Sequence, residues 1–349
     1  MQHILKAALA ASALALSVGL AQAQDLAPLN SDSEPDRADW SELEAKFGAF
    51  PEPAAGTKVG GVSKTLTNEY WRSLGQGYET FGKAHGVTVV YQAAQSEGDQ
   101  LGQLSIAENL ISQGFDALLF SPQTDANLMP ALESATDAGI PVVNVNDAVI
   151  PTVAHYVGNV QKENGVRVAQ WFIENHPEGG KVAVVEGQAG VFAATQRTAG
   201  FTETIAANDK FQIVASVPAD WSRELAFNAA STILQQHPDL IGFYANNDGM
   251  ALGVVEAVKA ADKAEQVAVF GTDGTSDAYN AVRDGDLTGT VDSFAVLTGE
   301  IAMEVGLRLA AGQDLPRVVA TPQALITKDN VETYATTDMQ ELRKVLTSQ

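Results

Sequence analysis

The chain has 349 residues, and its 43 acidic and 21 basic side chains give a formal net charge of −22. Such a charge repels phosphate backbones and anionic lipid surfaces, which argues against nucleic acid as a partner. The sequence contains no cysteine, so disulfides, thiolate nucleophiles and thiolate metal sites are excluded.

The first 23 residues have the pattern of an export signal. Lys6 supplies a positive charge, residues 7–20 are almost wholly apolar, and Ala21-Gln22-Ala23 has the small-x-small pattern of a cleavage site. The apolar run is too short to cross a bilayer comfortably. We expect cleavage after Ala23 and, because no lipid-attachment cysteine follows, a mature protein free in the periplasm.

Residues 24–57 are acidic, contain several prolines and are predicted to form an extension ahead of the first core strand. Within it, Asp39 to Glu42 favours the start of a short helix with Trp40, Leu43 and Phe47 on one face. We assign this extension no function.

From residue 58 onward, short apolar strands alternate with longer amphipathic helices. Strands are predicted at 58–62, 88–93, 117–120 and 142–145, then at 181–186, 211–217, 241–245, 267–270 and 288–292. Helices are predicted at 71–85, 100–113, 126–138, 166–175, 195–207, 225–236, 250–261 and 297–311. This alternation indicates right-handed βαβ units. Two such series predict an α/β fold with two doubly wound parallel-sheet lobes.

Ligands of open parallel sheets bind beyond the carboxyl ends of the strands, so the residues that follow each predicted strand are the candidate site. They are mostly amides, carboxylates, hydroxyls and aromatics: Lys64, Asn68, Tyr70, Trp71, Ser121, Asn146, Asp147, Thr195, Trp221, Asn247, Asp273 and Ser293. Amides both donate and accept hydrogen bonds, carboxylates accept from hydroxyls, and aromatic faces cover C–H groups. The mixture predicts a site for a neutral sugar or polyol. Asp248, beside Asn247, is expected to cap the helix that it precedes.

Four stretches at these positions carry a family resemblance: residues 64–71 (KTLTNEYW), 139–143 (GIPVV), 244–253 (YANNDGMALG) and 271–274 (GTDG). Together, in this order and spacing, they make residues 58–327 resemble the periplasmic ribose-binding protein family of type I sugar-binding proteins. The resemblance implies that the same twelve positions contact the ligand. It also implies three crossovers between the lobes, near 159–160, 293–294 and 321–323, with hinge closure about them. The expected N-terminal lobe is 58–159 plus 294–322, and the expected C-terminal lobe is 160–293 plus 323–349.

The sequence departs from the family at the two arginines that grip ribose. Their positions fall within the Asn146-Asp147 pair and on Thr195, while Arg197 falls on a neighbouring structural position. A lysine such as Lys64 is a compact cation and does not replace a planar guanidinium. These departures favour a linear polyol or another pentose over ribose.

We therefore expect a monomeric solute-binding protein of an ABC importer, without cofactor, metal or catalytic activity, that passes a sugar or polyol to a membrane permease. A sensor or chemoreceptor for a furanose-like signal is an alternative, because one fold serves both roles. A carbohydrate-active enzyme is a weaker alternative and would use Asp147 and Asp273 as facing carboxylates. The five histidines are scattered and form no nucleophile pair or metal-ligand spacing.

Overall fold

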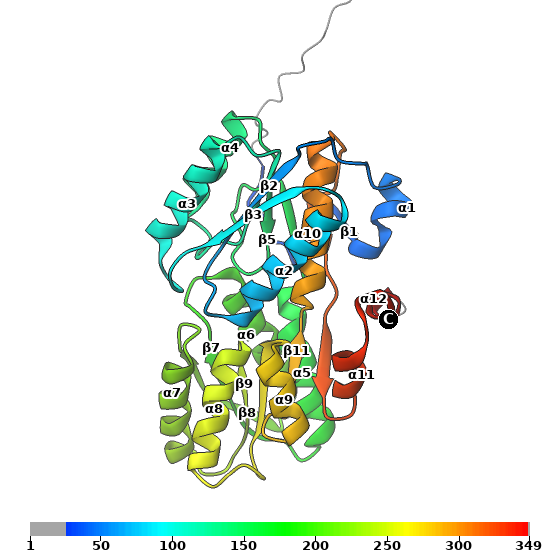
Figure 1. Ribbon diagram of the computed structural model, residues 1–349. Coiled ribbons are helices and arrows are strands. Elements are labelled where there is room, and N and C mark those ends of the chain that lie inside the picture. Colours follow the sequence, from blue (N-terminus) through cyan, green and yellow to red (C-terminus); the bar gives the residue numbers. More distant parts are fainter. Residues whose placement is uncertain (1–25, 348–349) are drawn as a thin grey trace, which may run out of the picture.

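Two separate β-sheets, each covered by helices on both faces, divide the chain into two lobes that lie end to end (Figure 1). The computed structural model describes residues 26–347, so the expected signal segment and its cleavage site at Ala23 lie outside the described residues. Within residues 26–347, no helix has both the length and the apolar character needed to cross a membrane. The two lobes confirm the α/β fold class.

The N-lobe is built on a seven-stranded sheet whose paired strands are all parallel. Its spatial order is β1 (Arg37–Asp39), β12 (Val318–Ala320), β6 (His155–Gly158), β5 (Val142–Val145), β4 (Ala117–Phe120), β2 (Lys58–Ser63) and β3 (Thr88–Ala93). Helices α2 (Glu69–Ala84) and α10 (Ala295–Ala310) pack together on one face, and α3 (Gln100–Ser112) and α4 (Met129–Asp137) lie on the other. The central strands are buried on both sides, which explains their continuous apolar sequences.

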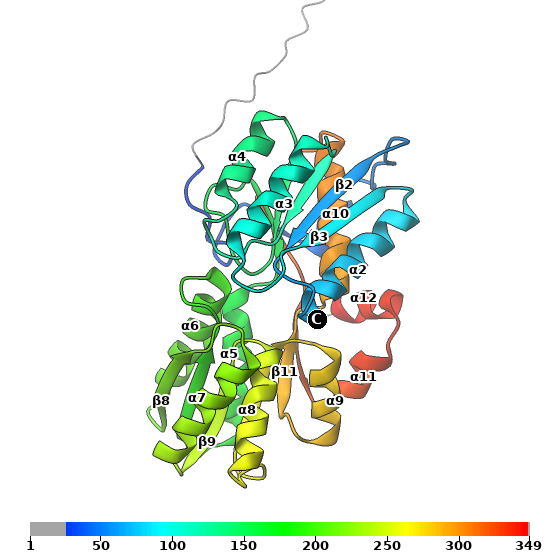
Figure 2. The ribbon, with the colours of Figure 1, turned by 60° about the vertical axis from the view of Figure 1, so that its left-hand side comes forward.

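The C-lobe is built on a six-stranded sheet in which only the edge strand β13 is antiparallel among the paired strands. Its spatial order is β13 (Ala324–Thr327), β11 (Gly289–Asp292), β10 (Ala268–Asp273), β9 (Leu240–Ala245), β7 (Gly180–Glu186) and β8 (Phe211–Pro218). Helices α5 (Gln161–Asn175) and α6 (Phe192–Ala206) cover one face. Helices α7 (Arg223–Gln236), α8 (Asp248–Ala260) and α9 (Ser276–Asp284) cover the other (Figure 2).

Every predicted strand and helix is present, with ends shifted by a few residues. The elements that were not predicted are mostly short: β1, β6, β12, β13, α9, α11 (Val331–Thr336) and α12 (Met339–Thr347). The missed strands β1, β6, β12 and β13 have only three or four residues each, and their place in the sheets is fixed by pairing with strands far away in the chain. The chain passes between the sheets after β6, β11 and β12.

The acidic extension is more closely integrated into the N-lobe than we expected. Its strand β1 pairs with β12 and becomes the edge of the sheet. The expected short helix is present: Asp39 caps the 3-10 turn η1 (Trp40–Glu42), which leads into α1 (Leu43–Phe47). The Arg317 guanidinium holds the segment before β1 by donating to the carbonyl of Ala27 and by pairing with Glu34 at 3.2 Å.

The C-terminal segment also differs from the expected boundary, which placed residues 323–349 in the C-lobe. Strand β13 and helix α11 pack on the C-lobe, but α12 returns to the N-lobe beside α10 (Figure 2). There Arg343 pairs with Glu300 of α10 at 2.6 Å, and Leu342 and Leu346 are buried. The apolar stripe of α12 finds its partner only in the folded molecule, so the sequence did not predict this return.

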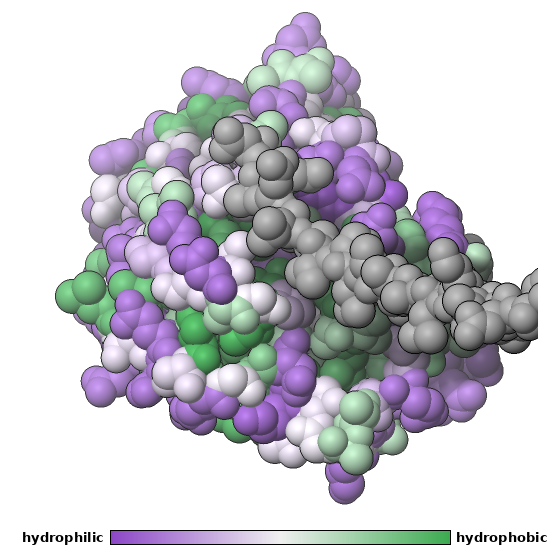
Figure 3. Space-filling view, turned by 90° about the horizontal axis from the view of Figure 1, so that it is seen from above, coloured by the Kyte–Doolittle hydropathy of each residue, from purple (hydrophilic) through white to green (hydrophobic). Residues whose placement is uncertain are grey.

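The surface is predominantly polar. The outer end of the N-lobe shows hydrophilic residues interspersed with smaller hydrophobic areas (Figure 3). Within residues 26–347, the large hydrophobic side chains that are exposed are Leu66, Leu101 and Leu225. They lie at or just before the first turns of three different helices, α2, α3 and α7.

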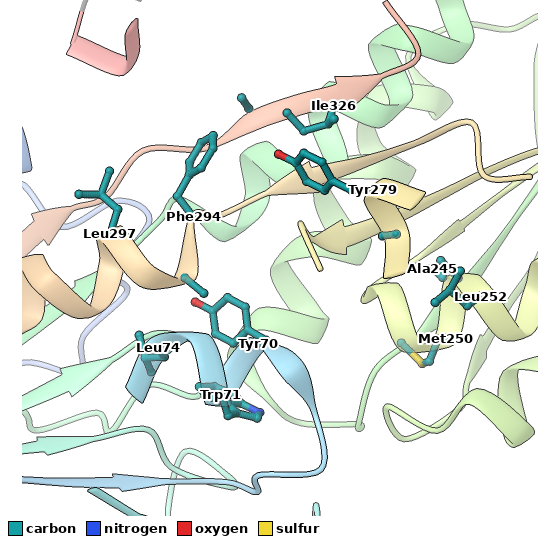
Figure 4. Packing of buried hydrophobic residues seen from close by; sticks show 14 of the residues in the cluster. Tyr70, Trp71, Leu74, Ala245, Met250, Leu252, Tyr279, Phe294, Leu297 and Ile326 are labelled. Carbon is teal, nitrogen blue, oxygen red and sulfur yellow. The ribbon is translucent and has the colours of Figure 1, made fainter. Parts of the chain in front are cut away.

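One crossover contains a strained residue held by a buried carboxylate. Phe294 has a φ of 48°, and its N–H donates to Asp292 Oδ1 at 2.6 Å. The Tyr279 hydroxyl donates to the other carboxylate oxygen at 2.7 Å. Burial raises the pKa of Asp292 to about 7, although both hydrogen bonds lower it. Phe294, in the crossover, and Tyr279 lie close to each other in Figure 4.

We predict that the contribution of Asp292 to the free energy of unfolding decreases as the pH rises from about 4 to about 7. The folded chain keeps this proton up to about pH 7, whereas an unfolded aspartate loses it near pH ~4. Stability therefore falls as the pH rises through this window, because the folded state binds more protons there. The Asp292→Asn variant should gain stability relative to the parent as the pH rises from 4 to 8, by up to roughly a few kcal/mol.

Urea unfolding at a series of pH values measures this difference. Asp284→Asn, at an exposed position on α9, is the control for removing one negative charge. A stability difference between Asp292→Asn and the parent that is the same at pH 4 and pH 8 would contradict the prediction.

Candidate functional site

A small cavity lies between the lobes, at the carboxyl ends of the strands of both sheets. Its lining is polar and aromatic and comes from both lobes: Asn68, Tyr70, Trp71, Glu97 and Asp147 of the N-lobe and Arg197, Trp221, Asn247 and Asp273 of the C-lobe. The volume left between these side chains is about 10 Å³. That is room for about one water molecule, so a sugar-sized molecule enters only if the lobes separate.

Seven of the twelve predicted residues line this cavity: Asn68, Tyr70, Trp71, Asp147, Trp221, Asn247 and Asp273. Lys64 lies directly behind the lining, fully buried and paired with Asp147. Asn146 also lies behind it, where its side-chain amide donates to the Tyr70 hydroxyl. These nine residues come together as the strand-end argument predicted.

The other three predicted residues do not line the cavity. Thr195 is on the exposed face of α6, and Arg197 occupies the position in the cavity instead. Residues two positions apart on a helix differ by about 200° in direction, so the side chains of Thr195 and Arg197 point to opposite sides. Ser121 is buried at the end of β4, where its carbonyl accepts from Gln103. Ser293 is buried in a crossover, where its carbonyl accepts from Thr298.

A chain of buried charges links the two lobes through the cavity. Lys64 Nζ pairs with Asp147, and Arg197 lies 3.6 Å from Asp147 and 3.8 Å from Asp273. The guanidinium is fixed by donating to Gln161 Oε1 at 2.8 Å and to the Asn246 carbonyl at 2.7 Å. Burial by itself would raise the pKa of Asp147, but the two cations lower it below its usual value.

Two indole rings, one from each lobe, enclose the lysine. Lys64 Nζ lies 5.7 Å from the centre of the Trp71 ring and 5.5 Å from that of Trp221. These are cation–π distances. Trp71 projects from the first turn of α2 beside Tyr70 (Figure 4), and its Nε1 donates to Glu97 at 3.2 Å.

The Trp221 ring lies directly on Gly187, which leaves no space for a larger residue there. A Cβ at position 187 would lie 2.1 Å from Cη2 of the indole. The small residue after β7 therefore determines where the aromatic wall of the C-lobe stands.

Several polar groups at the cavity have unused hydrogen-bonding capacity. Glu97 Oε2 and Trp221 Nε1 are buried without a hydrogen-bond partner among residues 26–347. Burial raises the pKa of Glu97 and raises that of Asp273 well above its usual range, despite the nearby Lys64 and Arg197. Buried polar groups normally have partners, so this arrangement suits a ligand that carries hydroxyls.

Four residues of the site have backbone conformations that residues other than glycine rarely adopt. Asn146, Asp147, Trp221 and Asp273 have φ values of 52°, 58°, 63° and 135°. Such strain persists only where the surroundings impose it, and it concentrates at functional sites.

Asp248 holds the strained loop that follows Asp273. Its carboxylate accepts from the backbone N–H groups of Gly274 and Thr275 and from the Thr290 hydroxyl. We expected Asp248 to cap α8, and this was wrong. Asn247 is the N-cap, accepting from Met250 at 2.9 Å through Oδ1. Its amide nitrogen is not used by the cap.

Sequence reasoning missed two cavity residues. Glu97 follows β3 by a few residues, so the same strand-end argument could have selected it. Arg197 was placed at a neighbouring structural position and is in fact part of the lining. It is the single basic residue of α6, but only the helical phase shows which way it points.

We predict that Lys64 is essential for stability because its removal leaves a buried carboxylate without its closest partner. Lys64→Met should lower the free energy of unfolding by about 3–5 kcal/mol. The control is Lys162→Met, which removes an equivalent pair with Glu203 in which both side chains are largely exposed. Its effect should be about 0–1 kcal/mol. Denaturant unfolding at pH 7 measures both, and equal losses would contradict the prediction.

Comparison with known proteins identifies the fold and the family. Residues 59–314 match the family model described as a periplasmic binding protein domain. The D-ribose/D-allose-binding protein of Pseudomonas aeruginosa is 33% identical over 279 residues, which cover 76% of this chain and 87% of that protein. The xylitol-binding protein of Mycolicibacterium smegmatis is 30% identical over 266 residues, which cover 74% and 73%.

A solved structure leads to the same family. The periplasmic solute-binding protein of Actinobacillus succinogenes with bound D-allose has a TM-score of 0.76 and 31% identity, and the match covers 80% of this chain and 100% of that chain. Residues 59–314 of the family match contain all the residues that line the cavity. The chain belongs to the periplasmic binding proteins, in the ribose-binding type that its sequence motifs resemble.

Proposed function

We propose that this protein binds one neutral monosaccharide or sugar alcohol between its lobes in the periplasm and delivers it, as a monomer, to the permease of an ABC importer. The observation that carries the proposal is the cavity itself. The two lobes contribute aromatic faces, amides and carboxylates to one small cavity, and Glu97 and Trp221 have unused hydrogen-bonding capacity there. Hydroxyl-rich solutes match such a lining, because an unpaired buried group penalises any ligand that lacks hydroxyls.

The charges at the site favour a neutral ligand. Both cations, Lys64 and Arg197, are already balanced by Asp147 and Asp273 within the protein. A ligand carrying phosphate or carboxylate would compete for these cations beside Glu97 and Asp273, and burying an unpaired charge is costly. The site therefore favours sugars and polyols over their phosphorylated or oxidised derivatives.

Arg197 changes what the sequence suggested about ligand identity. Arg197 supplies the planar guanidinium that is missing at Thr195. The other arginine position, within the Asn146-Asp147 pair, remains without an arginine. By their descriptions, the Pseudomonas relative binds D-ribose or D-allose, the Actinobacillus structure holds D-allose, and the Mycolicibacterium relative binds xylitol. Pentoses, aldohexoses and linear polyols are thus the ligand classes to test first.

Closure of the lobes is the proposed binding step. Because the residual volume is about 10 Å³, solute entry requires the lobes to separate about the crossovers after β6, β11 and β12. A solute that contacts both lobes has higher affinity for the closed form and shifts the population toward it. Export with cleavage after Ala23 would place the protein where such solutes arrive.

The carboxylates suit binding better than catalysis. Asp147 is occupied by two cations, and Asp273 shares Arg197 with it, so the pair does not face an open space as a glycosidase pair does. Within residues 26–347, no cluster of His, Asp or Glu side chains is arranged to hold a metal ion. The pairing of Asp147 and Asp273 with cations supports a binding role.

The proposal predicts that a neutral sugar or polyol raises the melting temperature of the purified protein. A panel of D-ribose, D-allose, other pentoses, xylitol and myo-inositol tests this by thermal shift, since a ligand bound to the native state stabilises it by mass action. The matching sugar phosphates and sugar acids are the controls and should have little effect. Stabilisation only by the charged compounds, or by none, would refute the proposed ligand class.

A second prediction concerns the wall formed by Trp221. Gly187→Ala should push the indole out of place and weaken binding of the best ligand at least ~10-fold, about 1.4 kcal/mol. Trp221→Ala should have an effect of similar size, because both changes remove the same aromatic face. Titration calorimetry measures both. Normal binding by Gly187→Ala together with weak binding by Trp221→Ala would show that Gly187 does not position the ring.

A further inference from the structure

Two helices of the C-lobe begin without a side chain of their own to cap them. The N-cap residue of α5 is Val160 and that of α6 is Val191, and neither forms a side-chain capping hydrogen bond. The first N–H groups of a helix have no partner within the helix, and valine cannot accept a hydrogen bond from them. These donors must find acceptors elsewhere.

The N-lobe supplies the acceptors for α6. Asp125, in the loop after β4, accepts from the N–H of Phe192 at 3.3 Å while also accepting from Val149 of its own lobe at 3.0 Å. The next N–H of the helix, from Ala193, donates to the backbone carbonyl of Asp147 at 3.1 Å. The N-terminus of α6 is thus capped across the boundary between the lobes.

Helix α9 has its own N-cap, because the Thr275 hydroxyl oxygen accepts from the N–H of Ala278, and a carboxylate of the N-lobe adds a further contact at its first residue. Glu69, the first residue of α2 in the N-lobe, accepts from the N–H of Ser276 at 2.9 Å and from its hydroxyl at 2.8 Å. Ser276 is the first residue of α9. Glu69 follows Asn68 of the cavity, and Ser276 lies three residues after Asp273, so this contact adjoins the binding site.

A third carboxylate behaves differently because of its position. Asp32 of the extension accepts from the N–H groups of Gln161 and Lys162 at 2.9 and 2.7 Å and so caps α5. Gln161 directly follows the first crossover, where a hinge rotation displaces atoms least. Phe192 and Ser276 belong to no crossover, so separation of the lobes breaks their contacts with Asp125 and Glu69.

We propose that Glu69 and Asp125 are positioning residues for ligand binding: they cap helices of the opposite lobe only when the lobes are closed, and so slow ligand release without touching the ligand. The inference rests on the proposed closure around a solute. A helix cap is a sizeable interaction, and a negative charge at a helix N-terminus adds to it. Loss of one cap should speed dissociation roughly fivefold and leave association almost unchanged.

The Glu69 contact allows a test from both sides. Glu69→Ala removes the acceptor, and Ser276→Pro removes both donors at a helix position that tolerates proline. If the two residues act through each other, the double variant should release ligand no faster than either single variant. Stopped-flow kinetics with the sugar that gives the largest thermal shift measures the rates. Glu133→Ala, an exposed acidic residue of α4, is the control and should leave both rates unchanged.

Asp125→Ala tests the second cap and should speed ligand release. Asp125→Asn should release ligand more slowly than Asp125→Ala, because its amide oxygen still accepts an N–H. Dissociation rates equal to those of Glu133→Ala, or additive effects in the Glu69→Ala/Ser276→Pro double variant, would overturn the proposal.

A measurement without ligand separates this inference from the proposed function. The chain has no cysteine, so Glu108→Cys and Gln235→Cys place one spin label on each lobe, at exposed positions of α3 and α7. Pulsed electron–electron distance measurements should show that Glu69→Ala and Asp125→Ala shift the population toward longer distances. An unchanged distribution in both variants would refute the caps even if sugars bind. Failure of every sugar to bind would refute the proposed function. The distance measurement would still test the caps, because it uses no ligand.

Discussion

The charge chain from Lys64 through Asp147 and Arg197 to Asp273 is the interaction on which the rest of the site depends. Each of these groups is buried, and a buried charge is tolerated only when it is paired and hydrogen-bonded. The chain begins in the N-lobe and ends in the C-lobe, so its geometry is complete only when the lobes are together. It places a balanced set of charges where the solute is expected, and this balance favours neutral ligands.

The residues around this chain are held by strain and by a second layer of hydrogen bonds. Asn146 and Asp147 turn in the left-handed region immediately after β5, and this turn directs one side chain to Tyr70 and the other to Lys64. Asp248 holds the loop after Asp273 through backbone N–H groups and a threonine hydroxyl. The protein thus orders each lobe's half of the site before any ligand arrives, which reduces the entropy lost on binding.

The segments outside the matched family region join the lobes in further ways. The extension reaches from the N-lobe sheet to the start of α5 through Asp32, and α12 returns from the C-lobe to α10 through Arg343. Both lie outside residues 59–314. They add contacts between the lobes to the three covalent crossovers, and such contacts influence how far and how readily the lobes separate.

How much the sequence predicted depended on the range of the interactions involved. Strands such as 117–120 and helices such as 297–311 were found because burial on a sheet produces a local apolar pattern, and nine of the twelve candidate residues lie in or directly behind the cavity for the same topological reason. Thr195 was wrong and Glu97 was missed, because a helical phase and the path of a loop decide which side chain faces inward.

The sequence by itself determined the two-lobed α/β architecture, the edge of each sheet that carries the site and the polar, aromatic character of that site. These follow from hydrophobic periodicity and from the rule that parallel strands present their carboxyl ends together. Only the tertiary structure decided that Arg197 joins the lining, that Asn247 rather than Asp248 caps α8, and that carboxylates of one lobe cap helices of the other. Arg197 and the interlobe carboxylates contact residues far apart in the chain, and Asp248 bonds to the distant loop at Gly274 and Thr275 instead of to its own helix, so no local pattern encodes these choices.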